Sequence, residues 1–229
     1  MKISEIFESI QGEGTNAGKP AIFLRTAECN LRCSWCDTKY TWDWNNFDYA
    51  TEVNEMSIKE IRKELEQFTN RHLVITGGEP LMQQDDLADL LTFLKPDFYV
   101  EVETNGTILP NNALSALVDQ WNVSPKTINS GNPLALCEDS ECYAFFSKQK
   151  NCYFKYVIEN EDDLIEINNL IEKYGLVRDR IMLMTQASTK EEMAEREKAV
   201  FFLSKKNNLS YSPRTVSYTH LTLPTILLV

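Results

Sequence analysis

The 229-residue sequence is poor in positive charge, since 23 Lys and Arg stand against 34 Asp and Glu and the formal net charge is −11. A nucleic-acid-binding surface needs clustered Lys and Arg, so this balance argues against a nucleic-acid partner. No apolar run approaches the ~20 residues that a membrane-spanning helix needs, so we expect no contact with a membrane. A chain of this length has ample residues for the core of one domain.

A secretory start is also missing, because residues 1–5 have no basic segment followed by a long apolar stretch. We therefore expect a cytoplasmic protein whose six cysteines are free or metal-bound thiols rather than disulfides. Charged residues are absent from the tail, residues 215–229, in contrast with the chain before it. We expect residues 1–214 to form the domain and residues 215–229 to be divergent or non-native.

Three cysteines, Cys29, Cys33 and Cys36, follow an apolar run at 21–24 that predicts a buried strand. Sites are usually built in loops at the exits of such strands. A closed zinc site takes four ligands, so three thiolates suit an open site better. They also suit an iron–sulfur cluster, because a four-iron cluster held by three cysteines leaves one iron free to bind a small molecule.

Other short motifs accompany the pattern Cys-x3-Cys-x2-Cys. In chain order they are IQGEG at 10–14, FLR at 23–25, CDT at 36–38, TGGEP at 76–80, ETNG at 103–106 and VSPK at 123–126. Together, and in this order, they resemble the 7-carboxy-7-deazaguanine synthases, a family within the radical S-adenosylmethionine (SAM) superfamily. The resemblance covers roughly residues 1–214 and stops at the tail.

The resemblance implies a [4Fe–4S] cluster on Cys29, Cys33 and Cys36, whose open iron binds SAM. The implied SAM contacts follow three later strands: Gly78, Glu79, Glu103, Ser124, Pro125 and Lys126. Taken alone, Glu103 is equally an exposed acid at a strand end, and residues 124–126 are an ordinary turn. The reduced cluster would split SAM to begin radical chemistry, with a donor such as flavodoxin or ferredoxin supplying the electron.

The implied substrate is 6-carboxy-5,6,7,8-tetrahydropterin, which loses ammonia to give 7-carboxy-7-deazaguanine for the biosynthesis of queuosine and related 7-deazapurines. The implied substrate contacts are Ile10, Gln11, Gly12, Glu13, Arg25 and Thr76. Glu13 would pair with the guanidine-like edge of the pterin, and Arg25 would hold its carboxylate. Mg²⁺ is implied between the substrate and the hydroxyl of Thr38, although this hydroxyl alternatively caps the loop backbone. Related enzymes are often homodimers.

Strands alternate with helices through most of the chain, which predicts a parallel sheet with right-handed crossovers. The expected fold class is α/β, a partial (β/α) barrel of the radical SAM type with about six parallel strands. These strands are expected at 21–24, 73–75, 98–103, 121–124, 152–158 and 181–184, with a further strand at 2–9. Residues 127–151 are expected to form a loop. The pairs Ser57–Glu60 and Ser188–Glu191 predict capping boxes.

Residues 37–55 are rich in aromatic side chains and predict either a lid or a loop packed by its own rings. Two other functions also fit the cysteines. One is a radical SAM activase that makes a glycyl radical on a partner protein. The other is an interaction module with a structural zinc, for which Cys137 or Cys142 would supply the fourth ligand. Otherwise these two cysteines are ordinary thiols without a function.

Overall fold

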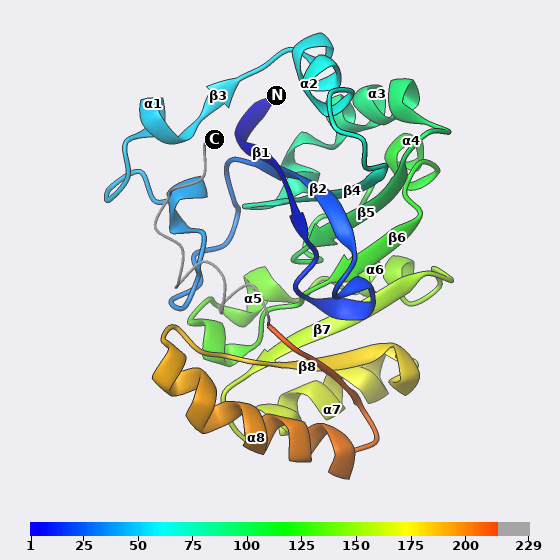
Figure 1. Cartoon of the computed structure of the whole chain (residues 1–229). Helices are drawn as coiled ribbons and strands as arrows, with labels where there is room; N and C mark the ends of the chain where they lie inside the picture. Colours follow the sequence, from blue (N-terminus) through cyan, green and yellow to red (C-terminus); the bar gives the residue numbers. More distant parts are fainter. Residues whose placement is uncertain (215–229) are drawn as a thin grey trace.

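The computed structural model describes residues 1–214, and one open sheet of nine strands runs through them (Figure 1). The strand order is β3-β1-β2-β4-β5-β6-β7-β8-β9. The strands are β1 Lys2–Ile10, β2 Pro20–Thr26, β3 Asn54–Glu55, β4 His72–Gly77, β5 Tyr99–Thr104, β6 Gln120–Val123, β7 Cys152–Ile158, β8 Ile181–Thr185 and β9 Ser210–Ser212.

Neighbouring strands from β2 to β9 are parallel, whereas β1 is antiparallel to both β2 and β3. The expected partial barrel is confirmed, and all six predicted strands lie in its parallel part. The structure adds β9 as a seventh parallel strand. Three residues are too few to show a period in the sequence, so β9 went unpredicted.

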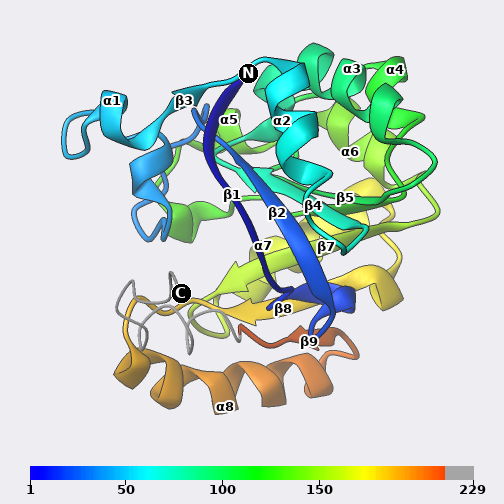
Figure 2. The same cartoon turned by 45° about the horizontal axis from the view of Figure 1, so that its top comes forward.

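Helices lie on the outside of the curved sheet, and α8 runs along β8 and β9 (Figures 1 and 2). The α-helices are α1 Tyr49–Glu52, α2 Ile58–Leu65, α3 Gln84–Leu94, α4 Asn112–Ser115, α5 Leu134–Cys137, α6 Ser140–Phe146, α7 Asp163–Tyr174 and α8 Lys190–Lys206. The short 3-10 helices are η1 Gly14–Asn16, η2 Lys39–Thr41, η3 Pro80–Gln83, η4 Ile128–Ser130 and η5 Arg178–Arg180. Within residues 1–214, no helix combines the length and the apolar character needed to cross a membrane.

Two local predictions need correction. Residues 127–151 do not form a plain loop, since η4, α5 and α6 lie within them. The helices are too short to show a clear period, and α6 is capped by Asp139, whose side chain accepts from the backbone of Cys142. The capping box of α2 at Ser57 is confirmed. That of α8 is shifted by one residue, because Thr189 is the N-cap and accepts from the backbone N–H of Glu192.

Alternation along the strands separates the apolar core from the interior of the barrel. On β5, the buried Val100 and Val102 join the main core, while Glu101 lies between them. The same phase holds on β6, where the side chains between the core residues are polar, and on β7, where Lys155 and the apolar Val157 occupy interior positions. The polar interior side chains are Glu101, Glu103, Gln120, Asn122 and Lys155. The helices therefore cover an apolar outer face, and the polar residues of three central strands face the inside.

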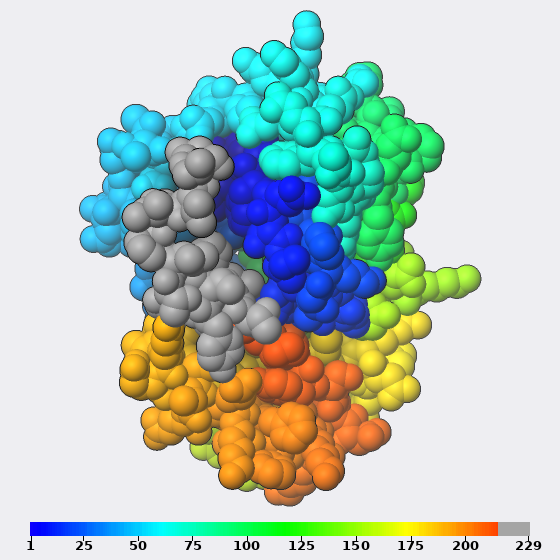
Figure 3. All heavy atoms as spheres, in the orientation of Figure 1, coloured from blue at the N-terminus to red at the C-terminus, as the bar shows by residue number. Residues whose placement is uncertain are grey.

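The first and last described segments meet beside this interior. The backbone N–H of Gly14, after β1, donates to Oγ of Ser212 on β9 at 2.9 Å. Figure 3 shows the N-terminal strands (blue) lying directly above the end of the described chain (orange-red) on one face of the molecule. The loop after β1 is thus placed at the mouth of the barrel by residues about 200 positions away along the chain.

The aromatic segment at 37–55 is largely packed by its own rings. Trp44 and Tyr49 meet edge to face with ring centroids 4.9 Å apart, and Tyr40 and Phe47 do so at 6.4 Å. These contacts favour the second of the two interpretations of this segment. Tyr40 and Phe47 also line the cavity described next, so the packed loop forms part of its wall.

Candidate active site

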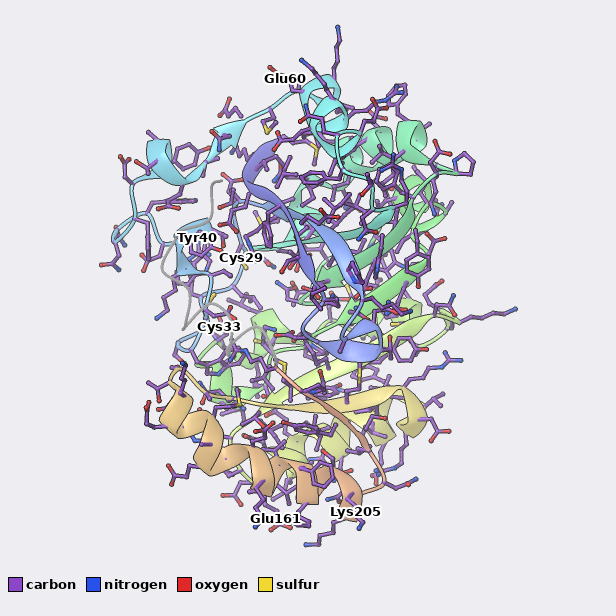
Figure 4. All side chains as sticks on the ribbon, in the orientation of Figure 1. Cys29, Cys33, Tyr40, Glu60, Glu161 and Lys205 are labelled. Atoms are coloured by element: carbon purple, nitrogen blue, oxygen red, sulfur yellow. The ribbon has the colours of Figure 1, made fainter. Side chains whose placement is uncertain are left out.

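A cavity of about 810 Å³ lies inside the barrel at the C-terminal ends of the parallel strands. Most of the residues that the sequence predicted as site residues line it. They are Ile10, Gln11, Glu13, Arg25, Cys29, Cys33, Cys36, Thr38, Thr76, Gly78, Glu103, Ser124 and Lys126. Figure 4 shows Cys29, Cys33 and Tyr40 near one another, whereas Glu161 and Lys205 lie far from them. Among the predicted residues, Gly12, Glu79 and Pro125 do not line the cavity.

The three cysteines of the loop after β2 each receive a hydrogen bond at sulfur. The backbone N–H of Leu31 lies 3.5 Å from Sγ of Cys29. The side-chain amide of Asn132 donates to Cys33 at 3.2 Å, and the indole N–H of Trp42 donates to Cys36 at 3.3 Å. Hydrogen bonds to sulfur are one of the means by which proteins stabilise and tune iron–sulfur clusters.

The surroundings of Cys29 and Cys33 keep these two thiols protonated until a metal displaces the proton. Burial raises the pKa of Cys29 to about 12 and also raises that of Cys33. Ligation must therefore release protons. Within residues 1–214, no three His, Cys, Asp or Glu side chains converge as they would around one metal ion. The three cysteines line one cavity, and in a four-iron cluster each cysteine binds a different iron.

Cys137, a candidate fourth ligand, lies behind the cysteine loop. It packs with Leu31 and Cys33 but does not line the cavity. Cys142 belongs to the main core on the other side of the sheet. Neither thiol therefore faces the space that the three loop cysteines share.

The backbone at the end of β4 lies in close contact with the backbone at the start of the cysteine loop. A Cβ atom on Gly78 would stand 2.0 Å from the carbonyl oxygen of Glu28 and 3.0 Å from Cβ of Cys29. A Cβ on Gly77, whose φ is +140°, would stand 2.2 Å from the carbonyl oxygen of Thr26. Only glycine permits this approach, which brings the backbone of residue 78 beside the thiols.

Glu79, predicted to bind SAM, has its side chain turned away from the cavity. The side chain is fully buried, and its carboxylate accepts from Leu81 N at 3.0 Å, Thr104 Oγ1 at 2.7 Å and Asn105 N at 2.7 Å. Burial raises the pKa of Glu79, and these hydrogen bonds lower it in part. The carboxylate thus ties the exit of β4 to the exit of β5. Its backbone remains next to Gly78.

Two further predicted residues face the cavity with distinct partners. Lys126 Nζ donates to the carbonyl and the hydroxyl of Ser124, both at 2.8 Å, and lies 5.6 Å from the ring centroid of Trp35. Thr38 presents its hydroxyl 3.6 Å from Sγ of Cys36. That hydroxyl makes no capping bond to the loop backbone, so the alternative interpretation of Thr38 has no support in the structure.

The substrate side of the cavity is built around Glu103. One carboxylate oxygen accepts from Gln11 Nε2 at 3.1 Å, and the other accepts from Thr76 Oγ1 at 2.8 Å. Gln11 also donates to the buried Glu101 at 3.0 Å. Glu103, predicted as a SAM ligand, is therefore bonded to two of the residues predicted to contact the substrate. Ile10 stands at the rim with half of its surface exposed.

Glu13 is held by two cations that the sequence analysis did not single out. Its carboxylate forms a hydrogen-bonded ion pair with Lys155 on β7, and Nε of Arg214 lies 3.7 Å from its other oxygen. The sequence did contain an indication that Lys155 is buried, because this residue occupies an interior position between the core residues Phe154 and Tyr156. A lysine at such a position needs a buried carboxylate. The contact of Arg214 with Glu13 could not be predicted, since Arg214 lies outside any periodic segment of the sequence.

Arg25, on β2, also faces the cavity. Its side chain is 14% exposed, and Nε donates to Glu5 Oε2 at 2.9 Å. The hydroxyl of Tyr40 donates to the same carboxylate oxygen at 3.2 Å. The sequence indicated that a buried arginine needs an anion, and Glu5 on β1 fulfils part of that need. Arg25 keeps further donors on its guanidinium for a second anion.

Comparisons with known proteins agree with this arrangement. A model of the radical SAM superfamily matches residues 23–185. A curated 7-carboxy-7-deazaguanine synthase from Pyrobaculum aerophilum is 37% identical over 216 residues, which cover 93% of this chain and 92% of that protein. The chain belongs to the 7-carboxy-7-deazaguanine synthase family of the radical SAM superfamily. Another member, from Hyperthermus butylicus, is 33% identical over 93% of this chain and 90% of its own.

A solved structure from the same family shares the fold. The crystal structure of QueE from Escherichia coli matches with a TM-score of 0.68 and 25% identity, covering 92% of each chain. Members of the 7-carboxy-7-deazaguanine synthase family are radical SAM enzymes and use a [4Fe–4S] cluster and SAM. In this chain the cluster fits Cys29, Cys33 and Cys36, since their sulfurs share one cavity and each has a hydrogen-bond donor.

Proposed function

We propose that this enzyme converts 6-carboxy-5,6,7,8-tetrahydropterin to 7-carboxy-7-deazaguanine and ammonia. The observation that carries the proposal is one cavity with three thiols at one end and the group formed by Gln11, Glu103 and Thr76 at the other. A cluster-bound cofactor and a small polar substrate would therefore share one enclosed space. The names of the relatives add support, because each is a 7-carboxy-7-deazaguanine synthase.

Residues at the cysteine end would hold the cluster and SAM. Cys29, Cys33 and Cys36 would bind three irons, and the backbone at Gly78 and Glu79 would receive the amino group of SAM. Ser124, Pro125 and Lys126 would contact the rest of SAM. When bound and reduced, the cluster and SAM supply a species able to remove a hydrogen atom from carbon.

Residues at the other end would bind and orient the pterin. Gln11 and Thr76 would contact its polar edge, with Ile10 at the rim of the site. Glu13, aligned by Lys155 and Arg214, would accept from the amino and ring N–H groups of the pterin. We place Glu103 with these residues because of its hydrogen bonds to Gln11 and Thr76.

Charged groups at the mouth would hold the substrate carboxylate. Arg25 lies in the wall and has donors left after its contact with Glu5. Thr38, whose hydroxyl is free of the loop backbone, would bind Mg²⁺ together with the carboxylate. Holding the carboxylate in this way would orient the carbon that bears it toward the cysteine end of the cavity.

We further propose a cytoplasmic homodimer that receives electrons from a small redox protein such as flavodoxin or ferredoxin, and whose product enters queuosine-type deazapurine synthesis. This part of the proposal rests on the family resemblance alone. Size-exclusion chromatography with light scattering would test the dimer.

Anaerobic reconstitution followed by product analysis tests the proposed reaction. The purified enzyme is loaded with iron and sulfide, mixed with SAM, reductant, Mg²⁺ and the carboxypterin, and the products are identified by mass spectrometry. We expect a deazapurine carboxylate and equimolar ammonia. A loaded enzyme that cleaves SAM but forms no deazapurine would contradict the substrate assignment. That result would favour the activase, which the same sample tests when a glycyl-radical enzyme is added.

A further inference from the structure

Lys155 lies on the substrate side of the cavity, and its side chain is only 9% exposed. Its ammonium group is hydrogen bonded to Glu13 and interacts electrostatically with Glu103. Glu103 in turn interacts with Lys155 more strongly than with any other charged group. An ammonium group and two carboxylates from three different segments thus share one buried space.

The proposed reaction contains a step that needs an acid and a base. The substrate has the composition of the product plus ammonia, so the overall conversion is redox neutral. When ammonia leaves a saturated ring carbon, a carbon–carbon double bond forms only if the neighbouring carbon gives up a proton. The enzyme must therefore take one proton from carbon and give one proton to nitrogen, away from bulk water.

Few groups in the described lining of the cavity are able to give up that proton. Arg25 and Arg214 stay protonated at any ordinary pH. Lys126 is bonded to the residues of its own turn, at the end of the cavity where SAM is expected. The hydroxyl of Tyr40 donates its proton to Glu5 Oε2 on β1. Lys155 is the remaining amine, and it stands among the expected substrate contacts.

We propose that Glu103 and Lys155 are the base and the acid that expel ammonia. This inference rests on the function proposed above. Glu103 takes the proton from the ring carbon, and the electron pair of that C–H bond forms the double bond. The C–N bond breaks with its electron pair moving to nitrogen, and Lys155 donates a proton to this nitrogen, which leaves as ammonia. The proton on Glu103 then passes to the neutral amine of Lys155, so both groups return to their starting forms.

The surroundings of both groups suit these roles. Glu13 and Glu103 raise the pKa of Lys155 above its ordinary value, so the ammonium keeps its proton until the leaving nitrogen gains the electron pair of the breaking C–N bond and becomes basic enough to take it. Burial raises the pKa of Glu103, although Lys155 lowers it in part, and this makes its carboxylate a stronger base. Glu13 holds the ammonium in place through its hydrogen bond.

The variant Lys155→Arg tests the acid, because it keeps the positive charge opposite Glu13 but cannot release a proton. We expect ammonia release to fall by about 10²- to 10⁴-fold. A ring-contracted isomer of the substrate that still carries the nitrogen should accumulate, and chromatography with NMR would detect it. Ammonia release at the wild-type rate would overturn the proposal, as would recovery of unchanged substrate alone.

Chemical rescue separates proton donation from a structural role. In Lys155→Ala, added alkylammonium ions should restore ammonia release, with rates that depend on the pKa of the added amine. In Glu103→Gln, a deuterium label at C7 of the pterin should be retained in the accumulated isomer. Rescue that is insensitive to amine pKa, or product formed by Glu103→Gln at the wild-type rate, would argue against the pair.

Lys173→Arg is the matched control, since Lys173 forms a single, exposed ion pair with Glu138 far from the cavity. Its ammonia release should equal that of the wild type. A wild-type enzyme that makes no deazapurine overturns the proposed function and this inference together. Normal product from both the wild type and Lys155→Arg overturns only this inference.

Discussion

Arg214 and Asp37 form a hydrogen-bonded ion pair that joins the end of the described chain to the cysteine loop, 177 residues away in sequence. The guanidinium also donates to the carbonyl of Ala187 at 2.8 Å, and its Nε lies 3.7 Å from Glu13. The side chain of Arg214 is 11% exposed. One cation therefore links the cysteine loop, the exit of β8 and the loop after β1.

We predict that Arg214→Met weakens substrate binding more than it slows chemistry. Glu13 loses one of its two aligning cations, which weakens its charge-assisted hydrogen bonds to the pterin, each worth about 1.5–3 kcal/mol when well aligned. The KM for the carboxypterin should rise roughly 10- to 150-fold with a smaller change in kcat. Arg178→Met is the control, because the side chain of Arg178 donates to Asn168 and Asn207 and does not line the cavity. An unchanged KM in Arg214→Met would remove Glu13 from the substrate site.

The stability of a Glu79 variant tests whether the side chain of Glu79 has a structural role or binds the cofactor. Its carboxylate satisfies three buried donors, so Glu79→Ala should lower the free energy of unfolding of the metal-free protein by about 3 kcal/mol. Urea unfolding followed by circular dichroism measures this. A side chain that served only to bind SAM would leave the stability of the metal-free protein unchanged. Glu66→Ala, which removes an exposed ion pair with Arg62, should cost about 1 kcal/mol or less.

The stability contributed by Lys155 should depend on pH at the alkaline end. Burial would lower the pKa of Lys155, but Glu13 and Glu103 raise it above its ordinary value of 10.5. The folded state therefore holds this proton more tightly than the unfolded chain does. The contribution is complete below pH 10.5 and is lost as the pH rises through the folded-state pKa.

Comparing the wild type with Lys155→Met in urea unfolding would test this pH dependence. Near neutral pH the variant should be less stable by about 3–5 kcal/mol, because Glu103 loses the opposing ammonium and Glu13 keeps Arg214 alone. The difference should shrink above pH 10.5 as the wild-type ammonium loses its proton. A difference that is the same at both pH values would mean that Lys155 is not charged in the folded state.

The sheet could be predicted from the sequence because most of its strands are visible as apolar runs or as alternating apolar and polar residues. Runs such as Leu73–Ile75 are buried and flanked by turn residues, and the main parallel strands followed from them. The short strand β9 and helix α5 could not be predicted in this way. Each is fixed by contacts distant in sequence, such as the packing of Cys137 against Cys33.

The three cysteines of the loop after β2 could be singled out because their spacing is local, but the ion pairs around Glu13 could not. Glu13 and Lys155 are 142 residues apart, and the sequence around each residue does not indicate which residue is its partner. The side-chain direction of Glu79 likewise depends on Thr104 and Asn105, which belong to the next strand exit. Motifs therefore located the site, while tertiary packing decided which atoms face it.

The account depends most on a cluster held by three cysteines with a fourth iron left for SAM, and Cys137 provides the direct test. Reconstituted Cys137→Ser should keep about four irons per chain and the wild-type rate of SAM cleavage. Cys33→Ser should lose both the iron–sulfur absorbance and SAM cleavage. Loss of the cluster in Cys137→Ser, or retention of SAM cleavage in Cys33→Ser, would contradict an open iron bound by SAM.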